Sequence, residues 1–187
     1  MKGIDEILKC EACRLSTTRR NLVLGRGRLN ADLLYIGEGP GKTEDLRGAA
    51  FIGAAGKLLD KMNEDARTLD ASDLPDLNKY YTNIVLCHPT DSFAGDNRIP
   101  RKDEVFACME NVLSIIRITS PRAIILVGNT AFEFYKRELP MAHHIQHPAY
   151  LLRKGGRGSP LYLRNVRILH EIMRGVHNEK SNISDCA

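Results

Sequence analysis

Three short apolar segments, each followed by a helical pattern, limit the possible folds of this chain more than any other feature. They read ADLLYIG (residues 31–37), YYTNIVL (80–86) and RAIILVG (122–128). Continuous apolar runs of this length are typical of strands covered on both faces, as in a parallel sheet. The intervening helical patterns are the crossover connections that parallel strands need. The chain is therefore predicted to be α/β, a three-layer α/β/α sandwich around a mainly parallel four-stranded sheet, with the fourth strand near AHHIQHP (142–148).

The length of 187 residues fits one domain that covers residues 1–187. Apolar residues make up 43% of the chain and charged residues 27%, as in ordinary water-soluble domains. No apolar stretch approaches the roughly 20 residues that a bilayer-spanning helix needs. The N-terminal MKGIDEILKC carries acidic residues early and has no apolar block of signal-peptide length. These features predict a cytoplasmic protein that does not enter a membrane.

One segment of the chain, from Leu139 to His170, is basic and contains no Asp or Glu. Its cations are Arg153, Lys154, Arg157, Arg164 and Arg167. These five charges exceed the net charge of the whole chain, which is +4. Charge alone leaves two interpretations open, a solvated basic face and a surface that contacts phosphates.

The first apolar segment runs into GEGPGKT, which raises the possibility of a phosphate-binding P-loop. That motif needs four residues between its first glycine and Gly-Lys-Thr, but Gly37 and Gly41 enclose three. Pro40 lies inside the loop and offers no N–H to a phosphate. The other strands end in Asn83 and Gly128 rather than a metal-binding carboxylate, which disfavours an NTPase. Ligands of parallel sheets bind beyond the carboxyl ends of the strands, so we expect a site here.

The cysteines form a second constellation. They are Cys10, Cys13, Cys87, Cys108 and Cys186. An odd number in a chain predicted to be cytoplasmic disfavours a disulfide framework. Structural zinc sites usually pair two close knuckles, whereas an iron–sulfur cluster accepts one CxxC with two isolated thiolates. The alternative is that Cys87 and Cys108 are simply buried apolar side chains.

The segment HIQHPAYLLRKGGRG (144–158) carries chemistry of another kind. His147-Pro148 is expected to open a loop in which apolar residues stand next to basic residues and glycines. Proteins use such a combination to wedge into a duplex while holding its phosphates, although a lone His-Pro is usually only a turn. His143 and His144 are interpreted as strand or surface residues.

Taken in order, GEGPGKTED, FIGAAGKLL, YYTNIVLC, HPAYLLR and four of the cysteines resemble the iron–sulfur uracil-DNA glycosylases, often called family 4. The resemblance runs from about Cys10 to Arg153, and it depends on five motifs in a fixed order. The Gly-Glu-small-Pro-Gly loop of that family is intact at Gly37–Gly41. The resemblance implies an enzyme that flips uracil out of DNA and cuts its N-glycosidic bond, leaving an abasic site.

The resemblance also implies which residues hold the base. Phe51 would stack on the flipped ring, and the Asn83 amide would accept from uracil N3–H and donate to O4. Backbone groups around Glu38 and Gly39, with Pro40 beside them, would line the remaining edge.

For the reaction itself, the resemblance assigns His147 to uracil O2, where negative charge gathers as the bond breaks. Glu38 is the first candidate for orienting the attacking water, and Glu44 is the second. A carboxylate near the sugar would also stabilise its oxocarbenium-like state.

The cofactor and the partner follow from the same resemblance. Four cysteines would hold a [4Fe–4S] cluster that serves as a structural cross-link: Cys10, Cys13, Cys87 and Cys108. Cys186 has no place in that set and is predicted to be free. The partner would be uracil-containing DNA, single- or double-stranded, bound by a monomer. Its phosphates would meet Arg153, Lys154 and Arg157, beside a wedge at Leu151 or Leu152.

Two departures from the family pattern stand out. The family usually has Arg-Pro before the stacking phenylalanine, whereas this chain has Ala49 and Ala50. The Cys87–Cys108 spacing is longer than is common, and the insertion TDSFAGDNR (90–98) accounts for it. A catalytically silent DNA-binding or polymerase-associated protein on the same scaffold is therefore the alternative function, and an NTPase comes third.

Overall fold

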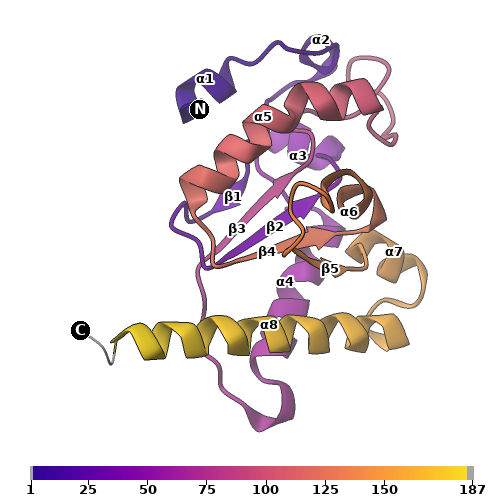
Figure 1. The fold of residues 1–187 in the computed structure, drawn as a ribbon. Coiled ribbons are helices and arrows are strands. Elements are labelled where there is room, and N and C mark those ends of the chain that lie inside the picture. Colours follow the sequence, from indigo (N-terminus) through magenta and orange to yellow (C-terminus); the bar gives the residue numbers. More distant parts are fainter. Residues whose placement is uncertain (1, 185–187) are drawn as a thin grey trace.

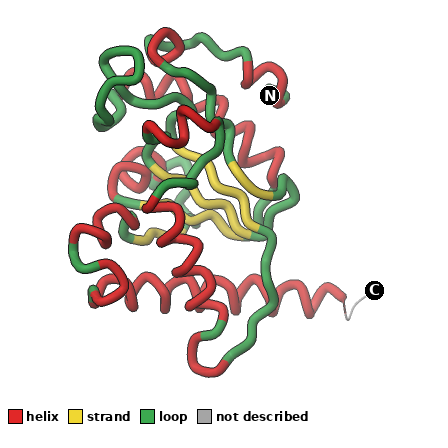
Figure 2. The backbone as a smooth tube through the Cα atoms, turned by 180° about the vertical axis from the view of Figure 1, so that it is seen from behind, coloured by secondary structure: helices red, strands yellow, loops and turns green. Residues whose placement is uncertain are grey.

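The computed structural model describes residues 2–184, with side chains to residue 180, and confirms the predicted α/β class. A five-stranded sheet in the order β1-β3-β2-β4-β5 lies between two groups of helices (Figures 1 and 2). Its strands are β1 (Arg26–Gly27), β2 (Leu33–Gly37), β3 (Lys79–Asn83), β4 (Ala123–Val127) and β5 (His143–Ile145). Strands β2 to β5 pair in parallel, and β5 is the fourth strand that the sequence predicted.

The fifth strand, β1, was not predicted. It pairs antiparallel with β3, with Arg26 opposite Tyr81 and Gly27 opposite Tyr80. Two residues are too few for a period-two pattern to appear in the sequence. Gly27 has a φ of 121°, and a Cβ there would lie 2.1 Å from the Lys79 carbonyl oxygen, so only glycine fits this pairing.

The helices cover both faces of the sheet. They are α1 (Ile4–Leu8), α2 (Leu15–Thr18), α3 (Lys42–Arg47), α4 (Ala54–Arg67), α5 (Lys102–Thr119), α6 (Asn129–Tyr135), α7 (Pro148–Arg153) and α8 (Pro160–Ser184), with short 3-10 turns η1 (Leu69–Ala71) and η2 (Gly156–Gly158). Figure 1 shows α5 on one side of the sheet and α4 with α8 on the other. Side chains of β2 alternate between these two cores, since Leu33 and Tyr35 join one cluster while Leu34 and Ile36 join the other.

The segment after His147 was predicted to be a loop, but it forms the helix α7. Pro148 occupies the first helical position, where a missing N–H removes no hydrogen bond. The His147 side chain caps the helix by accepting from the backbone N–H of Ala149. This capping geometry depends on where His147 points, which the sequence does not reveal.

No helix in the described part of the chain is both long enough and apolar enough to cross a membrane. The carboxyl ends of the central strands meet at one edge of the sheet, where Gly37 of β2 pairs with Asn83 of β3. The glycine loop after β2, the loop after β3 and helix α7 after β5 all leave the sheet at this edge (Figure 1). The fold therefore gathers the predicted site residues there.

Candidate functional site

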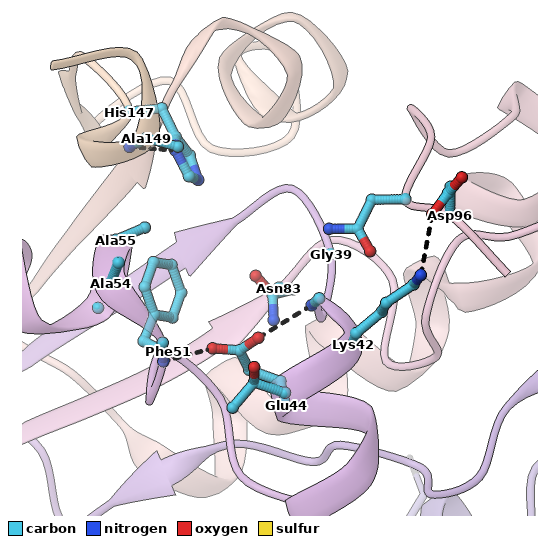
Figure 3. Close-up of a pocket in the computed structure, with 15 residues that line it drawn as sticks. Gly39, Lys42, Glu44, Phe51, Ala54, Ala55, Asn83, Asp96, His147 and Ala149 are labelled. Carbon is cyan, nitrogen blue, oxygen red and sulfur yellow. Dashed lines mark hydrogen bonds and ion pairs between the residues drawn. The ribbon is translucent and has the colours of Figure 1, made fainter. Parts of the chain in front are cut away.

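A cavity of about 470 Å³, called the main cavity below, opens at the carboxyl ends of β2 and β3. Five predicted site residues line it: Gly39, Glu44, Phe51, Asn83 and His147. Figure 3 shows the His147 ring pointing into the cavity toward Phe51, and the Asn83 side chain lying beside the Phe51 ring. Glu38 lines an adjoining cavity of about 670 Å³ that shares Gly39 and His147 with the first. Pro40 is buried in the turn and is absent from the lining of both cavities.

Phe51 lies in the cavity wall with an uncommon backbone conformation. Its φ is 55°, in the left-handed region, and its side chain is only 6% exposed. Gly37 and Gly56 make room for this arrangement. A Cβ on Gly37 would come within 2.5 Å of the Phe51 ring, and one on Gly56 would lie 1.7 Å from the Phe51 carbonyl oxygen. Strain of this kind persists only where the surroundings hold it, and it is common at ligand sites.

Arg26 supports the Phe51 turn from β1, and sequence reasoning missed it. Its Nε donates to the carbonyl oxygen of Ala50 at 3.1 Å, and its Nη2 donates to both oxygens of Asp60 at 2.9 and 3.1 Å. The guanidinium also lies 4.3 Å from the centroid of the Tyr81 ring. The turn thus receives a guanidinium from β1 rather than from position 49, where the expected family pattern has arginine and this chain has Ala49. Nothing in the local sequence pairs Arg26 with a turn more than twenty residues away.

Glu44 acts as a clamp between two loops. Its Oε2 accepts from the backbone N–H of Gly41 at 3.2 Å. Its Oε1 accepts from the backbone N–H groups of Ile52 and Gly53 at 3.1 and 2.7 Å. Both carboxylate oxygens are therefore committed to backbone groups on either side of the cavity. Glu38 makes no hydrogen bond within the described residues, which leaves it the more available of the two predicted glutamates.

The Asn83 side chain is buried but has no protein partner. It is 3% exposed, and no described residue donates to or accepts from its amide. Its position is tight, because a Cβ on Gly37 would lie 2.7 Å from Asn83 Oδ1. The amide lines the main cavity, so its donor and acceptor groups are available to a ligand that enters.

His147 is held as a neutral hydrogen-bond donor. Its Nδ1 accepts from the Ala149 N–H at 3.1 Å, so the proton of the neutral ring is on Nε2. Burial, with a further contribution from the charge of Arg153, lowers the pKa of His147 to about 4. The ring is therefore uncharged at neutral pH. Its centroid lies 6.4 Å from that of Phe51, at an angle of 30° between the planes.

The inserted loop after β3 also reaches the main cavity, which the sequence did not predict. Asp96 and Asn97 of this loop line the cavity opposite Lys42 of α3. Lys42 Nζ lies 2.8 Å from Asp96 Oδ1 (Figure 3). Asn97 Oδ1 lies 2.6 Å from Nε2 of the buried His88. The unusual length of the segment between Cys87 and Cys108 was the only signal for this loop.

The four predicted cluster ligands line one very small cavity of about 10 Å³, called the cysteine cavity below. They come from the N-terminal segment, the end of the β3 segment and α5, and none of the four forms a disulfide. Arg19 Nη1 donates to Cys87 Sγ at 3.1 Å, and Asn111 Nδ2 donates to Cys10 Sγ at 3.2 Å. Cys186 lies outside the described residues.

The chemistry of this cavity fits an iron–sulfur cluster. Burial raises the pKa of Cys87 to about 11 and that of Cys108 to about 12, so thiolates there need a positive partner. N–H donors to the sulfurs are the outer contacts that such clusters use. Within the described residues, no group of three or more His, Cys, Asp or Glu side chains is arranged to hold a metal ion. A cluster of several irons spreads its ligands more widely than one ion does.

The two leucines predicted as a wedge have different environments. Leu151 is fully buried in the core with α4 and α8, so it is not available to DNA. Leu152 is 42% exposed, and Tyr150 beside it is 37% exposed. Successive helical residues point in different directions, which explains why only one of two adjacent leucines faces solvent.

The three predicted phosphate contacts also differ. Arg153 lines the cavity next to His147, and Lys154 Nζ lies 5.9 Å from the Tyr150 ring centroid. Neither forms an ion pair within the described residues. Arg157 instead donates to Asp65 at 3.1 Å and ties η2 to α4. The structure thus leaves two of the three cations unpaired beside the cavity.

Comparisons with known proteins identify the family of this chain. The sequence model of the uracil DNA glycosylase superfamily matches residues 24–168. A type-4 uracil-DNA glycosylase of Saccharolobus solfataricus is 36% identical over 139 residues, which cover 73% of this chain and 60% of that protein. One from Thermotoga maritima is 36% identical over 131 residues, covering 70% and 62%. A DNA polymerase of Bacillus phage SP01 is 33% identical over 110 residues, 59% of this chain and 11% of the polymerase. The chain spans about three fifths of the length of these two glycosylases.

Proposed function

This chain belongs to the uracil DNA glycosylase superfamily, and on that premise we propose that it hydrolyses the N-glycosidic bond of uracil in DNA. The product would be an abasic site. The reaction requires that uracil leave the base stack and enter a pocket that recognises its edge. The main cavity supplies such a pocket at the carboxyl edge of the sheet.

Base recognition falls to Phe51 and Asn83. The Phe51 ring offers a buried aromatic face, and the Asn83 amide has one acceptor and two donor hydrogens without protein partners. Uracil presents N3–H beside O4, which matches an amide that accepts and donates. Cytosine presents an acceptor beside an amino donor, and an amide in the orientation that pairs with uracil would oppose both groups. Discrimination of this kind is strong because a mismatch leaves buried polar groups unpaired.

His147 stabilises the leaving uracil anion. As the bond breaks, negative charge gathers on uracil O2, and the Nε2–H of the neutral ring is the free donor toward the cavity. A donor that is already in place before the charge develops typically contributes about 3 kcal/mol. The Ala149 N–H keeps Nδ1 in the acceptor role, so it fixes the tautomer that this task needs.

Glu38 is the residue we assign to the attacking water. It is half-buried in the turn after β2, it lines the adjoining cavity, and its carboxylate has no partner within the described residues. A carboxylate near the sugar would orient the water and stabilise the cationic sugar. Glu44 takes the structural role instead, because its oxygens are bound to three backbone N–H groups.

A [4Fe–4S] cluster would be held by Cys10, Cys13, Cys87 and Cys108, the four residues that share the cysteine cavity. When bound, it would serve as a cross-link between the N-terminal segment, the β3 segment and α5. Arg19 and Asn111 would donate to its thiolates. No catalytic step depends on it.

Arg153 and Lys154 would bind DNA phosphates on the α7 side of the cavity. Leu152 and Tyr150 are the exposed apolar groups beside them. Arg157 contributes less, since it is already paired with Asp65. We expect the protein to act as a monomer in the cytoplasm.

A single observation carries the proposal: one cavity brings together a neutral histidine donor, an unpartnered buried amide and an aromatic face. The test uses an oligonucleotide with one deoxyuridine, followed by alkali to cut any abasic site. Wild-type protein should cleave at uracil, and Asn83→Ala and His147→Ala should each reduce the rate by about 100- to 1000-fold.

The second candidate is a silent DNA-binding module of a polymerase-like assembly, favoured by the match to the phage DNA polymerase. The same assay separates the two functions. Binding of uracil-containing DNA without uracil release, by protein that carries its full cluster absorbance, would replace the enzyme by the binding module.

A further inference from the structure

We propose that the inserted loop after β3 and the surface beside it form a second DNA-contacting wall, on which Phe93 stacks an unpaired base next to the flipped uracil. This inference rests on the proposed function and extends it to the form of the substrate. The surface, called the loop patch below, consists of Arg20, Lys42, Leu46, Phe93 and Asp96. None of these residues belongs to the α7 side of the cavity.

The patch presents exposed apolar side chains among cations. Phe93 is 62% exposed and Leu46 is 61% exposed. The Arg20 guanidinium lies over the Phe93 ring, 4.9 Å from its centroid, and pairs with no carboxylate within the described residues. Leu46 follows Lys42 by four residues, so both lie on one face of α3. Aromatic rings among cations are the usual platform for single-stranded nucleic acid, since every base has a face that can stack.

The patch is continuous with the main cavity. Lys42 of α3 and Asp96 of the loop belong both to the patch and to the cavity lining, and Asn97, next to Asp96 in the loop, also lines the cavity. Figure 3 shows the Lys42–Asp96 pair across the cavity from His147 and α7. A strand whose uracil enters the cavity must continue in both directions. One direction leads to Arg153 and Lys154, and the other leads to the loop patch. This continuity selects the uracil-bearing strand as the occupant.

The loop is anchored well enough to present Phe93 in a fixed place. Asp91 pairs with Arg14, Arg98 and Arg101 at 3.3, 3.0 and 2.9 Å. Arg98 also binds the fully buried Glu104 through two hydrogen bonds of 2.6 and 2.8 Å. Because these pairs fix the base of the loop, stacking on Phe93 does not require the loop to be ordered first.

Lys42 is the cation in the patch that DNA would engage. Its partner Asp96 has a side chain that is 98% exposed, and an ion pair in that setting is weak. A phosphate that approaches the patch can therefore take over the Lys42 ammonium. Asp96 then acts as a competitor of the phosphate, and its removal should favour DNA.

The test measures binding by fluorescence anisotropy with a labelled single-stranded oligonucleotide that carries 2′-fluoro-deoxyuridine. The fluorine disfavours the cationic sugar and so slows cleavage during the measurement. Phe93→Ala should weaken binding about 5- to 100-fold, and Phe93→Trp should bind within about twofold of wild type. Phe106→Ala is the matched control, because Phe106 is equally exposed at 62% but lies on α5 and packs against Phe134 of α6. It should leave the affinity unchanged.

The salt dependence of the binding constant tests whether Lys42 contacts a phosphate. Lys42→Gln should reduce the slope of log K against log salt by about 0.7, the contribution of one phosphate contact on a single strand. Asp96→Asn should tighten binding. In fully paired duplex the neighbouring bases are already stacked, so the effect of Phe93→Ala should be smaller there.

Two results would overturn the inference. Equal affinities of Phe93→Ala and Phe106→Ala would mean that the patch does not contact DNA and serves another partner. Equal affinities of Phe93→Leu and wild type would exclude stacking. Failure of the glycosylase proposal is detected separately. In that case wild-type protein would leave ordinary deoxyuridine uncut, while the binding measurements would still test the role of Phe93.

Discussion

The main cavity and the cysteine cavity are both lined by polar groups, but they differ in which of these groups already have a hydrogen-bond partner in the protein. The Asn83 amide in the main cavity and the Glu38 carboxylate in the adjoining one have no protein partner within the described residues. In the cysteine cavity, Cys10 and Cys87 each receive a hydrogen bond from an amide or a guanidinium.

Under the proposed function, the difference follows from how long each ligand stays bound. A group that must bind and release a base in every cycle has to remain unsatisfied in the free protein, at a cost in stability. The groups around a permanent cofactor can be satisfied once, during folding. Glu44 and Arg26 bind the backbone on the two sides of Phe51, at Gly53 and Ala50, and so hold its strained conformation.

The largest expected effect distinguishes Glu44 of the main cavity from Glu38 of the adjoining one. Glu38→Gln should slow uracil release about 100- to 10,000-fold with little change in Tm, because only the role at the water and the sugar is lost. Glu44→Gln should lower Tm by about 3–8 °C, because a donating amide replaces one acceptor in the clamp. Single-turnover rates and thermal unfolding measure both. A large rate loss in Glu44→Gln at unchanged Tm would reverse the assignment.

The next prediction concerns the cysteine cavity. Cys108→Ser should abolish the visible absorbance of the cluster and lower Tm by more than about 5 °C, since the cross-link between the N-terminal segment and α5 is lost. Cys186→Ser is the control and should keep both properties. Full cluster absorbance in the Cys108→Ser protein would remove that residue from the ligand set.

His147 makes the main cavity sensitive to acid. Its pKa of about 4 in the folded state lies below the ordinary value of 6.5, so the unfolded state binds the proton first as pH falls. Stability is therefore complete above pH 6.5 and declines between pH 6.5 and 4, by on the order of 2–3 kcal/mol. Urea unfolding across this range should show a shallower decline in His147→Gln than in wild type. Parallel plots of unfolding free energy against pH for the two proteins would contradict the assignment of His147 as a buried neutral ring.

The smallest expected effect tests the support of the Phe51 turn. Arg26→Ala should lower kcat/KM for uracil release about 5- to 10-fold, since the Ala50 carbonyl and Asp60 lose a forked donor. Arg26→Lys should recover little, because an ammonium cannot bind both groups in the same geometry. Arg28→Ala, two residues away and with its side chain bound to Asn78 on the surface, should match wild type. Equal losses of kcat/KM in the Arg26→Ala and Arg28→Ala variants would mean that the effect comes from removing a positive charge and not from the contacts of Arg26.

Much of this molecule could be predicted from local patterns. Apolar runs and helical spacing predicted the parallel strands and their crossover helices, because burial on both faces requires those patterns. The Gly-Glu-Gly-Pro-Gly turn, Asn83 and Gly128 were predicted to meet because parallel strands present their carboxyl ends at one edge. Glu38, Phe51 and His147 were identified through motif order rather than through any contact.

Only the tertiary structure decided the rest. It buried Leu151 and exposed Leu152, paired Arg157 with Asp65, and committed Glu44 to three backbone N–H groups. It also brought Arg26 to the turn at Ala50 and carried the inserted loop to the main cavity. Each of these depends on contacts between segments distant in the chain or on the direction of one side chain. Sequence spacing records neither, because a residue's neighbours in space are set only when the helices and strands pack together.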